Sequence, residues 1–150
     1  MVKHWARIGL WAWRFAMLAS LVTVAFFAWA AVMPFQTVGE PVFDMVILRA
    51  RQWNGLGFAL VQFFGVFLWL LAGLSAGAWR PGLMALGAGL VLFAGLVAMA
   101  SEYESLIQYD VLRDAEAVAR HKLMMSRSIT LALAVISLAL GWWARPKGIR

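Results

Sequence analysis

The sequence has no cysteine, and its few acidic residues are confined to two segments. Without cysteine the chain cannot form a disulfide bond, a thiolate metal site or a cysteine nucleophile. The seven acidic residues are Glu40, Asp44, Glu102, Glu104, Asp110, Asp114 and Glu116. Elsewhere long apolar runs alternate with basic residues only, which is the charge layout of a membrane protein.

Four apolar runs have no ionisable side chain near their middle: residues 15–33, 55–78, 82–100 and 123–144. About twenty helical residues cross the ~30 Å hydrocarbon core of a bilayer, so each run is long enough to span it. Arg127 lies near one end of the fourth run, where its side chain can snorkel toward the headgroups. We therefore predict an all-α integral membrane protein. It is a single domain, 1–150, with a four-transmembrane-helix bundle and helical extensions of the second and fourth helices outside the bilayer.

The lack of charge at the predicted membrane midplane narrows the function. Ion-coupled transporters and proton relays keep ionisable groups there despite their cost, so a secondary pump is disfavoured. Both histidines, His4 and His121, lie outside the runs, which removes paired axial ligands for a haem between helices. We predict no cofactor. Gln62 is an unusual carboxamide within the second run, and we expect it to hydrogen-bond to a neighbouring helix.

The positions of the basic residues predict the orientation. Lys3, Arg7 and Arg14 precede or begin the first run, and Arg145 follows the last. By the positive-inside rule both termini are then cytoplasmic, in the plasma (inner) membrane. Six of the nine tryptophans belong to the same side, where they form an interfacial belt: Trp5, Trp11, Trp13, Trp79, Trp142 and Trp143. Because the basic residues flank spans and form no patch, we predict no nucleic-acid partner.

Small residues four apart recur in the second and third runs, as Gly73 and Gly77 and as Ala85 and Gly89. This spacing opens a groove on a helix, so that another helix approaches closely. We predict that these residues pack helices together. The partner helix is either within the chain or in another subunit.

Two groups of residues beside the runs are candidate binding sites. Arg49, Arg51, Asn54 and Tyr103 could hold an anionic headgroup or ligand, because guanidinium groups pair with phosphate and carboxylate. Ordinary anchoring at the membrane interface explains the same residues. The second, weaker group contains metal-ligand types, at Asp114, His121 and Met124. A solvated charge ladder on a helix accounts for the acidic residues without a metal.

The stretch from Arg49 to Asn54 resembles the Arg-Ala-x-x-Asn run of a superfamily of small four-helix membrane enzymes of eicosanoid and glutathione metabolism. Tyr103 and Tyr109 precede the last helix somewhat as tyrosines do in that superfamily. The stretch has one extra residue before Asn54, and Gly57 lies near the place of the superfamily's glutamate. The resemblance supplies an enzyme hypothesis and no family assignment.

Two functional hypotheses follow. In the first, the chain is a non-catalytic integral membrane subunit, or an accessory or assembly factor, that packs against other membrane subunits in the lipid bilayer. In the second, it is a small homo-oligomeric membrane enzyme or binder that acts on a lipophilic or amphiphilic small molecule. The first predicts foreign polypeptides as partners, and the second predicts copies of the chain itself.

Overall fold

The computed structural model describes residues 2–32, 41–75, 79–111 and 116–146. Side chains are described over 6–32, 53–74, 79–98 and 124–146, together with His4, Ala50 and Ala100. These residues form four helices and no strand: α1 (Val2–Val32), α2 (Pro41–Ser75), α3 (Arg80–Val111) and α4 (Glu116–Trp143). The predicted all-helical class is confirmed.

Prolines lie close to the helix ends. Pro34 comes two residues after the end of α1 in the sequence. Pro41 is the first residue of α2, the position where a missing N–H costs nothing. Pro81 lies in the first turn of α3 for the same reason, next to a turn closed by the Gly82 N–H donating to the Trp79 carbonyl at 3.0 Å. Pro146 follows the last turn of α4.

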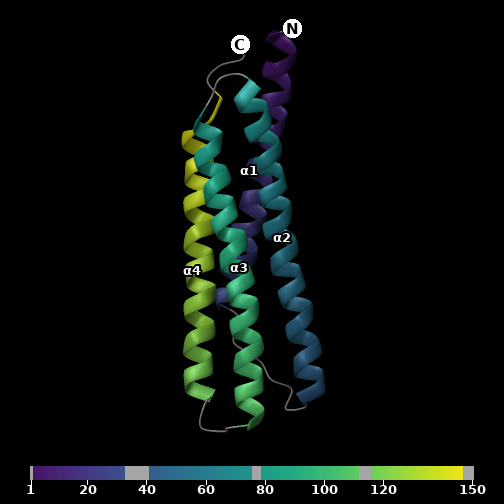
Figure 1. The fold of residues 1–150 in the computed structure, drawn as a ribbon, viewed down its shortest axis with the longest axis vertical. Helices are drawn as coiled ribbons and strands as arrows, with labels where there is room; N and C mark the ends of the chain where they lie inside the picture. Colours follow the sequence, from purple (N-terminus) through teal and green to yellow (C-terminus); the bar gives the residue numbers. More distant parts are fainter. Residues whose placement is uncertain (1, 33–40, 76–78, 112–115, 147–150) are drawn as a thin grey trace.

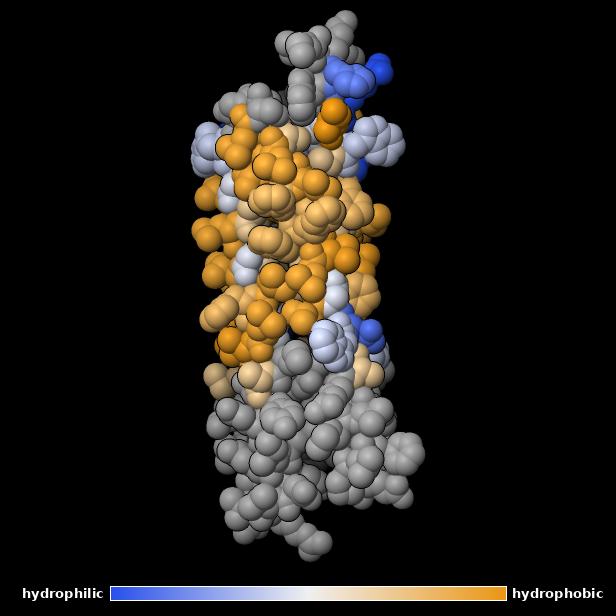
Figure 2. All heavy atoms as spheres, turned by 45° about the vertical axis from the view of Figure 1, so that its right-hand side comes forward, coloured by the Kyte–Doolittle hydropathy of each residue, from blue (hydrophilic) through white to orange (hydrophobic). Residues whose placement is uncertain are grey.

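Each helix contains a segment long and apolar enough to span a membrane: Ala6–Val32, Trp53–Leu74, Arg80–Ala98 and Met124–Trp143. These segments overlap the four predicted runs, and the first begins earlier than predicted. Figure 2 shows their side chains as a belt of apolar surface, with hydrophilic side chains above it. Helix α2 begins before its apolar segment, α3 continues past its own, and α4 begins before its own.

The helices form an antiparallel ring. Each helix contacts the next along the chain, and α1 contacts α4, whereas the backbones of the diagonal pairs do not approach one another in the described ranges. Both termini therefore lie at one end of the molecule, and the start of α2, the end of α3 and the start of α4 lie at the other (Figure 1). We call these the terminal end and the far end.

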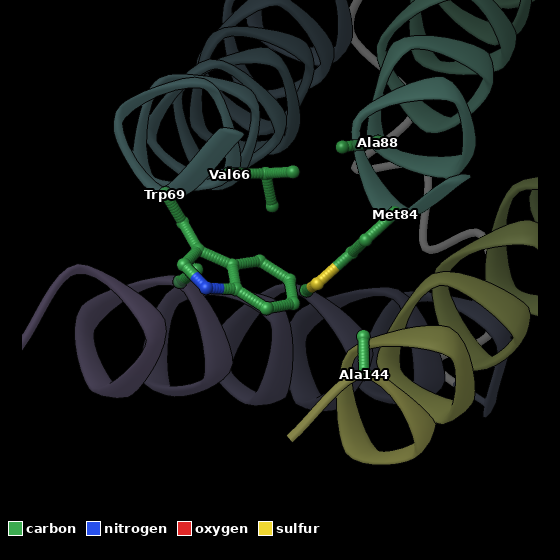
Figure 3. Packing of buried hydrophobic residues seen from close by; sticks show 6 residues of the cluster. Val66, Trp69, Met84, Ala88 and Ala144 are labelled. Atoms are coloured by element: carbon green, nitrogen blue, oxygen red, sulfur yellow. The ribbon is translucent and has the colours of Figure 1, made fainter. Parts of the chain in front are cut away.

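The interior has two apolar clusters. One, nearer the terminal end, contains Trp69 and Val66 of α2, Met84 and Ala88 of α3, and small residues of α1 and α4. The indole of Trp69 extends across the interior toward Met84 (Figure 3). The other, nearer the far end, consists of Phe27, Ala59, Val91 and Ala134. Small residues from all four helices let the backbones approach closely around a few large side chains.

Candidate functional site

A layer of polar side chains lies between the two apolar clusters. The Gln62 Nε2 of α2 donates to the Ser137 Oγ of α4 at 3.1 Å, which joins diagonal helices. The Thr23 Oγ1 of α1 donates to the Phe58 carbonyl of α2 at 3.1 Å as well as to its own helix. The expectation that Gln62 bonds to another helix is confirmed. Ser20 and Thr130 donate to carbonyls one turn back in their own helices.

Gln62 is fully buried, and its Oε1 has no hydrogen-bond partner among the described residues. Its surroundings are tight, since a Cβ added at Gly87 of α3 would lie 3.3 Å from the Ser137 Cβ. An unpaired buried acceptor costs about 1–3 kcal/mol relative to a solvated one. The layer therefore connects α2 and α4 at some cost in stability.

Arg127 also bonds across helices. Its side chain is only 8% exposed, and its guanidinium donates to the Ala30 carbonyl of α1 at 2.9 Å. The snorkelling that its position allows stays a prediction. Ala30 lies in the last turn of α1, where carbonyls have no partner within the helix. A cation at this position also interacts favourably with the helix dipole. Arg127 therefore joins α4 to the carboxyl end of α1.

Tryptophans and arginines gather at the terminal end. The Trp13 Nε1 of α1 donates to the Gly141 carbonyl of α4 at 3.0 Å. The guanidinium carbon of Arg145 lies 5.9 Å from the centre of the Trp13 ring and 5.6 Å from that of Trp142. Both distances are within the range of a cation–π interaction. These contacts connect α1 with the last turn of α4 and the residues just after it.

A groove of about 700 Å³ lies between α1 and α4 below these contacts. Nine residues line the groove. One of them, Arg14, is charged, one, Ala139, is small, and the other seven have larger apolar side chains. The α1 wall is formed by Trp13, Arg14, Met17, Leu18 and Leu21, and the α4 wall by Val135, Leu138, Ala139 and Trp142. The Arg14 guanidinium carbon lies 5.1 Å from the centre of the Trp11 ring, so Arg14 is also held by an aromatic ring. The groove is apolar along its walls and cationic at the terminal end.

The headgroup or ligand site predicted at Arg49, Arg51, Asn54 and Tyr103 stays a prediction. Asn54 is exposed, just inside the start of the apolar segment of α2. Arg49, Arg51 and Tyr103 lie on α2 and α3, and their side chains are outside the described ones. Their convergence on a pocket is therefore untested.

The weaker metal hypothesis is also untested. Asp114 lies outside the described residues, and His121 lies on α4 with its side chain outside the described ones. Met124 is exposed at the start of the apolar segment of α4. Within the residues that the structure describes, no three His, Cys, Asp or Glu side chains are grouped so as to hold a metal ion.

The predicted packing residues have neighbours within the chain where they are described. A Cβ added at Gly73 would lie 2.6 Å from Cγ of the Pro81 ring in α3, and one added at Gly89 would lie 3.7 Å from the Phe63 ring. Ala85 packs against the cluster of Trp69 and Met84. Gly77 lies outside the described residues. Whether another subunit also uses these positions stays open to test.

Comparisons with known proteins identify no relative: no protein-family model, curated protein or solved structure matches the chain.

The groove between α1 and α4 is the feature that the sequence reasoning missed. The sequence does show tryptophans and arginines near both termini. That they meet across a groove follows only from the contact between α1 and α4, which the structure supplies.

Proposed function

We propose that this chain is a non-catalytic integral membrane subunit, or an accessory or assembly factor, of a larger membrane complex. The supporting observation is a contrast between the interior and the outer surface. Described polar side chains of the interior bond to backbone carbonyls or to one another, as at Thr23, Gln62 and Arg127. Large apolar side chains on all four helices point outward. Such a molecule is built to hold its shape and to present apolar surface.

The outer surface suits lipid and partner helices alike. Leu18, Phe64, Phe93 and Ile136, one from each helix, are all more than half exposed, between 52% and 65%. Within a bilayer, helices associate through close packing and hydrogen bonds, because lipid is as apolar as the helices themselves. We propose that one of these four outer faces contacts another membrane subunit, while lipid covers the rest.

The proposal includes an orientation. The terminal end has seven Lys and Arg residues by sequence position and the far end has six, together with the seven acidic residues. The positive-inside rule then places both termini in the cytoplasm of a plasma (inner) membrane protein. The parts of α2, α3 and α4 beyond their apolar segments would extend outside the bilayer on the side opposite the cytoplasm.

A second candidate function is favoured by one specific observation, the groove between α1 and α4. An apolar groove with cations at one end fits an amphiphile. In this alternative the chain is a small homo-oligomeric membrane enzyme or binder that acts on a lipophilic or amphiphilic molecule. Copies of the chain would then replace foreign subunits as its partners.

The experiment that separates the two functions is native mass measurement after gentle solubilisation of an epitope-tagged chain from its native host. We expect stoichiometric foreign polypeptides to travel with it. Alanine variants at Leu18, Phe64, Phe93 and Ile136 then identify the contacting face, because one should lose the partner while all four keep the melting temperature of the isolated chain. An assembly that contains only copies of this chain would contradict the subunit proposal and favour the alternative.

A further inference from the structure

We propose that the groove between α1 and α4 binds an anionic phospholipid, with an acyl chain along the groove and the headgroup phosphate at Arg14 and Arg145. This inference rests on insertion of the four helices in a bilayer, which the proposed function shares. It does not depend on any protein partner. The argument combines the length, the lining, the charge and the rigidity of the groove.

The length of the groove fits one leaflet. Its α1 wall extends from Trp13 to Leu21, a separation of eight positions that corresponds to ~12 Å along a helix at ~1.5 Å per residue. Half of a ~30 Å hydrocarbon core is ~15 Å. The groove thus extends from the level of the interfacial tryptophans to nearly the middle of the bilayer. An acyl chain of the leaflet at the terminal end lies over this same depth.

The lining distinguishes a lipid chain from a transmembrane helix. Helix–helix contacts in membranes use small residues that let the backbones approach. The groove is instead lined by large side chains, such as Met17, Leu18 and Leu138, and Ala139 is its one small residue. Large side chains keep the backbone of a second helix at a distance, whereas a narrow hydrocarbon chain can lie between them.

The cations at the upper end of the groove have no acidic counterpart near them in the sequence. Arg14 lines the groove, and Arg145 lies over two of its tryptophans, Trp13 and Trp142. The acidic residues all lie between 40 and 44 or between 102 and 116 in the sequence. Five of them, Asp44, Glu102, Glu104, Asp110 and Glu116, belong to the parts of α2, α3 and α4 that lie toward the far end (Figure 1). Arginine pairs with phosphate through two parallel hydrogen bonds. A phosphate at the terminal end would therefore complement arginines that have no acidic side chain near them in the sequence.

The groove is formed before a ligand arrives. The Trp13 indole N–H and the Gly141 carbonyl fix α1 against α4 at its upper end. The Arg145 guanidinium contacts a ring on each of these helices, Trp13 on α1 and Trp142 on α4. A site whose walls and cations are already positioned loses little conformational freedom on binding. This favours retention of a specific lipid over exchange with the surrounding bilayer.

Native mass spectrometry of the purified full chain tests the site with two probes, dioleoyl phosphatidylglycerol and dioleoyl phosphatidylcholine. The two lipids have the same acyl chains, and only phosphatidylglycerol has a net negative charge. We expect one phosphatidylglycerol to be retained in preference to phosphatidylcholine. The double variant Arg14→Gln, Arg145→Gln should weaken retention of phosphatidylglycerol about tenfold, since each cation near an anionic lipid adds to the electrostatic attraction that holds it.

Two further variants make the test specific. Arg80 lies at the same end, with its guanidinium carbon 4.6 Å from the centre of the Trp143 ring, but outside the groove. Arg80→Gln should therefore leave lipid retention unchanged. Ala139→Trp should block the groove and lower retention without lowering the melting temperature, because Ala139 is exposed.

Three results would overturn the lipid site: equal retention of the two lipids, a loss with Arg80→Gln as large as with the double variant, or full retention by Ala139→Trp. A mass of two chains without lipid would also overturn it, in favour of a second copy. Because the chain is tested alone, a failure here leaves the search for protein partners unaffected.

Discussion

At the scale of single residues, the hydrogen bond between Gln62 and Ser137 joins two helices whose backbones are not neighbours. Only a long side chain can cross the interior in this way, and the Gln62 carboxamide does so with one oxygen left unpaired. The two partners differ in what each can do alone. A lone serine can donate to the carbonyl one turn back, as Ser20 does, whereas a lone buried glutamine has no such partner in its own helix.

This difference predicts an asymmetry between two substitutions. Ser137→Ala leaves the whole Gln62 carboxamide buried without a partner and should destabilise the protein by about 1–2 kcal/mol. Gln62→Leu removes the unpaired oxygen as well, and should cost less than Ser137→Ala. Titration with a denaturing detergent, followed by circular dichroism, measures both. If Gln62→Leu proves the more destabilising of the two, the account of this layer is wrong.

The sequence predicted the role of Gln62 but not its partner. A carboxamide within an apolar run has few ways to be satisfied except a bond to another helix, so its bonding could be foreseen. The choice of Ser137 depends on the register of α2 against α4, which no local pattern specifies. The partner of Arg127 could not be foreseen for a related reason. Its position near the end of a span allowed snorkelling toward the headgroups, but its bond to the Ala30 carbonyl depends on which helix lies beside it.

At the scale of elements, the four helices could be predicted because membrane spans are long apolar runs with charged flanks. The start of α1 was the main difference: the first run was placed from residue 15, but the helix begins at Val2. Lys3, Arg7 and Arg14 lie before the predicted run but within the helix, because backbone hydrogen bonds do not depend on side-chain polarity. Apolar composition therefore reports the length of a span better than the length of its helix.

The α2–α3 connection depends on a glycine. A Cβ at Gly73 would lie 2.6 Å from a carbon of the rigid Pro81 ring, so Gly73→Ala should force the two helices apart and destabilise the protein by about 1–3 kcal/mol. Gly57 lies on the same helix with open space around its Cβ direction, so Gly57→Ala is the matched control. It should be neutral or stabilise by up to about 1 kcal/mol, because alanine favours a helix more than glycine does.

Thermal unfolding in detergent, monitored by circular dichroism, compares the two glycine variants. The account expects a clear loss of melting temperature for Gly73→Ala only. Equal melting temperatures for the two variants would mean that α2 and α3 do not pack through Gly73 and Pro81.

At the scale of the whole molecule, the unequal charge of the two ends connects the fold with both proposals. The end with both termini combines cations, tryptophans and the groove, and the other end has all the acidic residues by sequence position. The charge asymmetry was visible in the sequence. The groove was not, because it requires α1 and α4, the first and last helices, to be neighbours in a closed ring.

Insertion through four crossings, with both termini in the cytoplasm, is the central claim on which the proposed subunit function and the lipid site both depend. Because the chain has no cysteine, single cysteines report topology without background. His4 precedes the first apolar segment and is exposed, and Ala100 follows the third and is also exposed. Three crossings separate these two positions, so they should lie on opposite sides of the membrane.

The most direct test is labelling of His4→Cys and Ala100→Cys with a membrane-impermeant maleimide in right-side-out membrane vesicles. We predict that the cysteine at position 100 is labelled in sealed vesicles, and that the cysteine at position 4 is labelled only after the membrane is opened. Labelling of both positions in sealed vesicles, or of position 4 alone, would contradict the account.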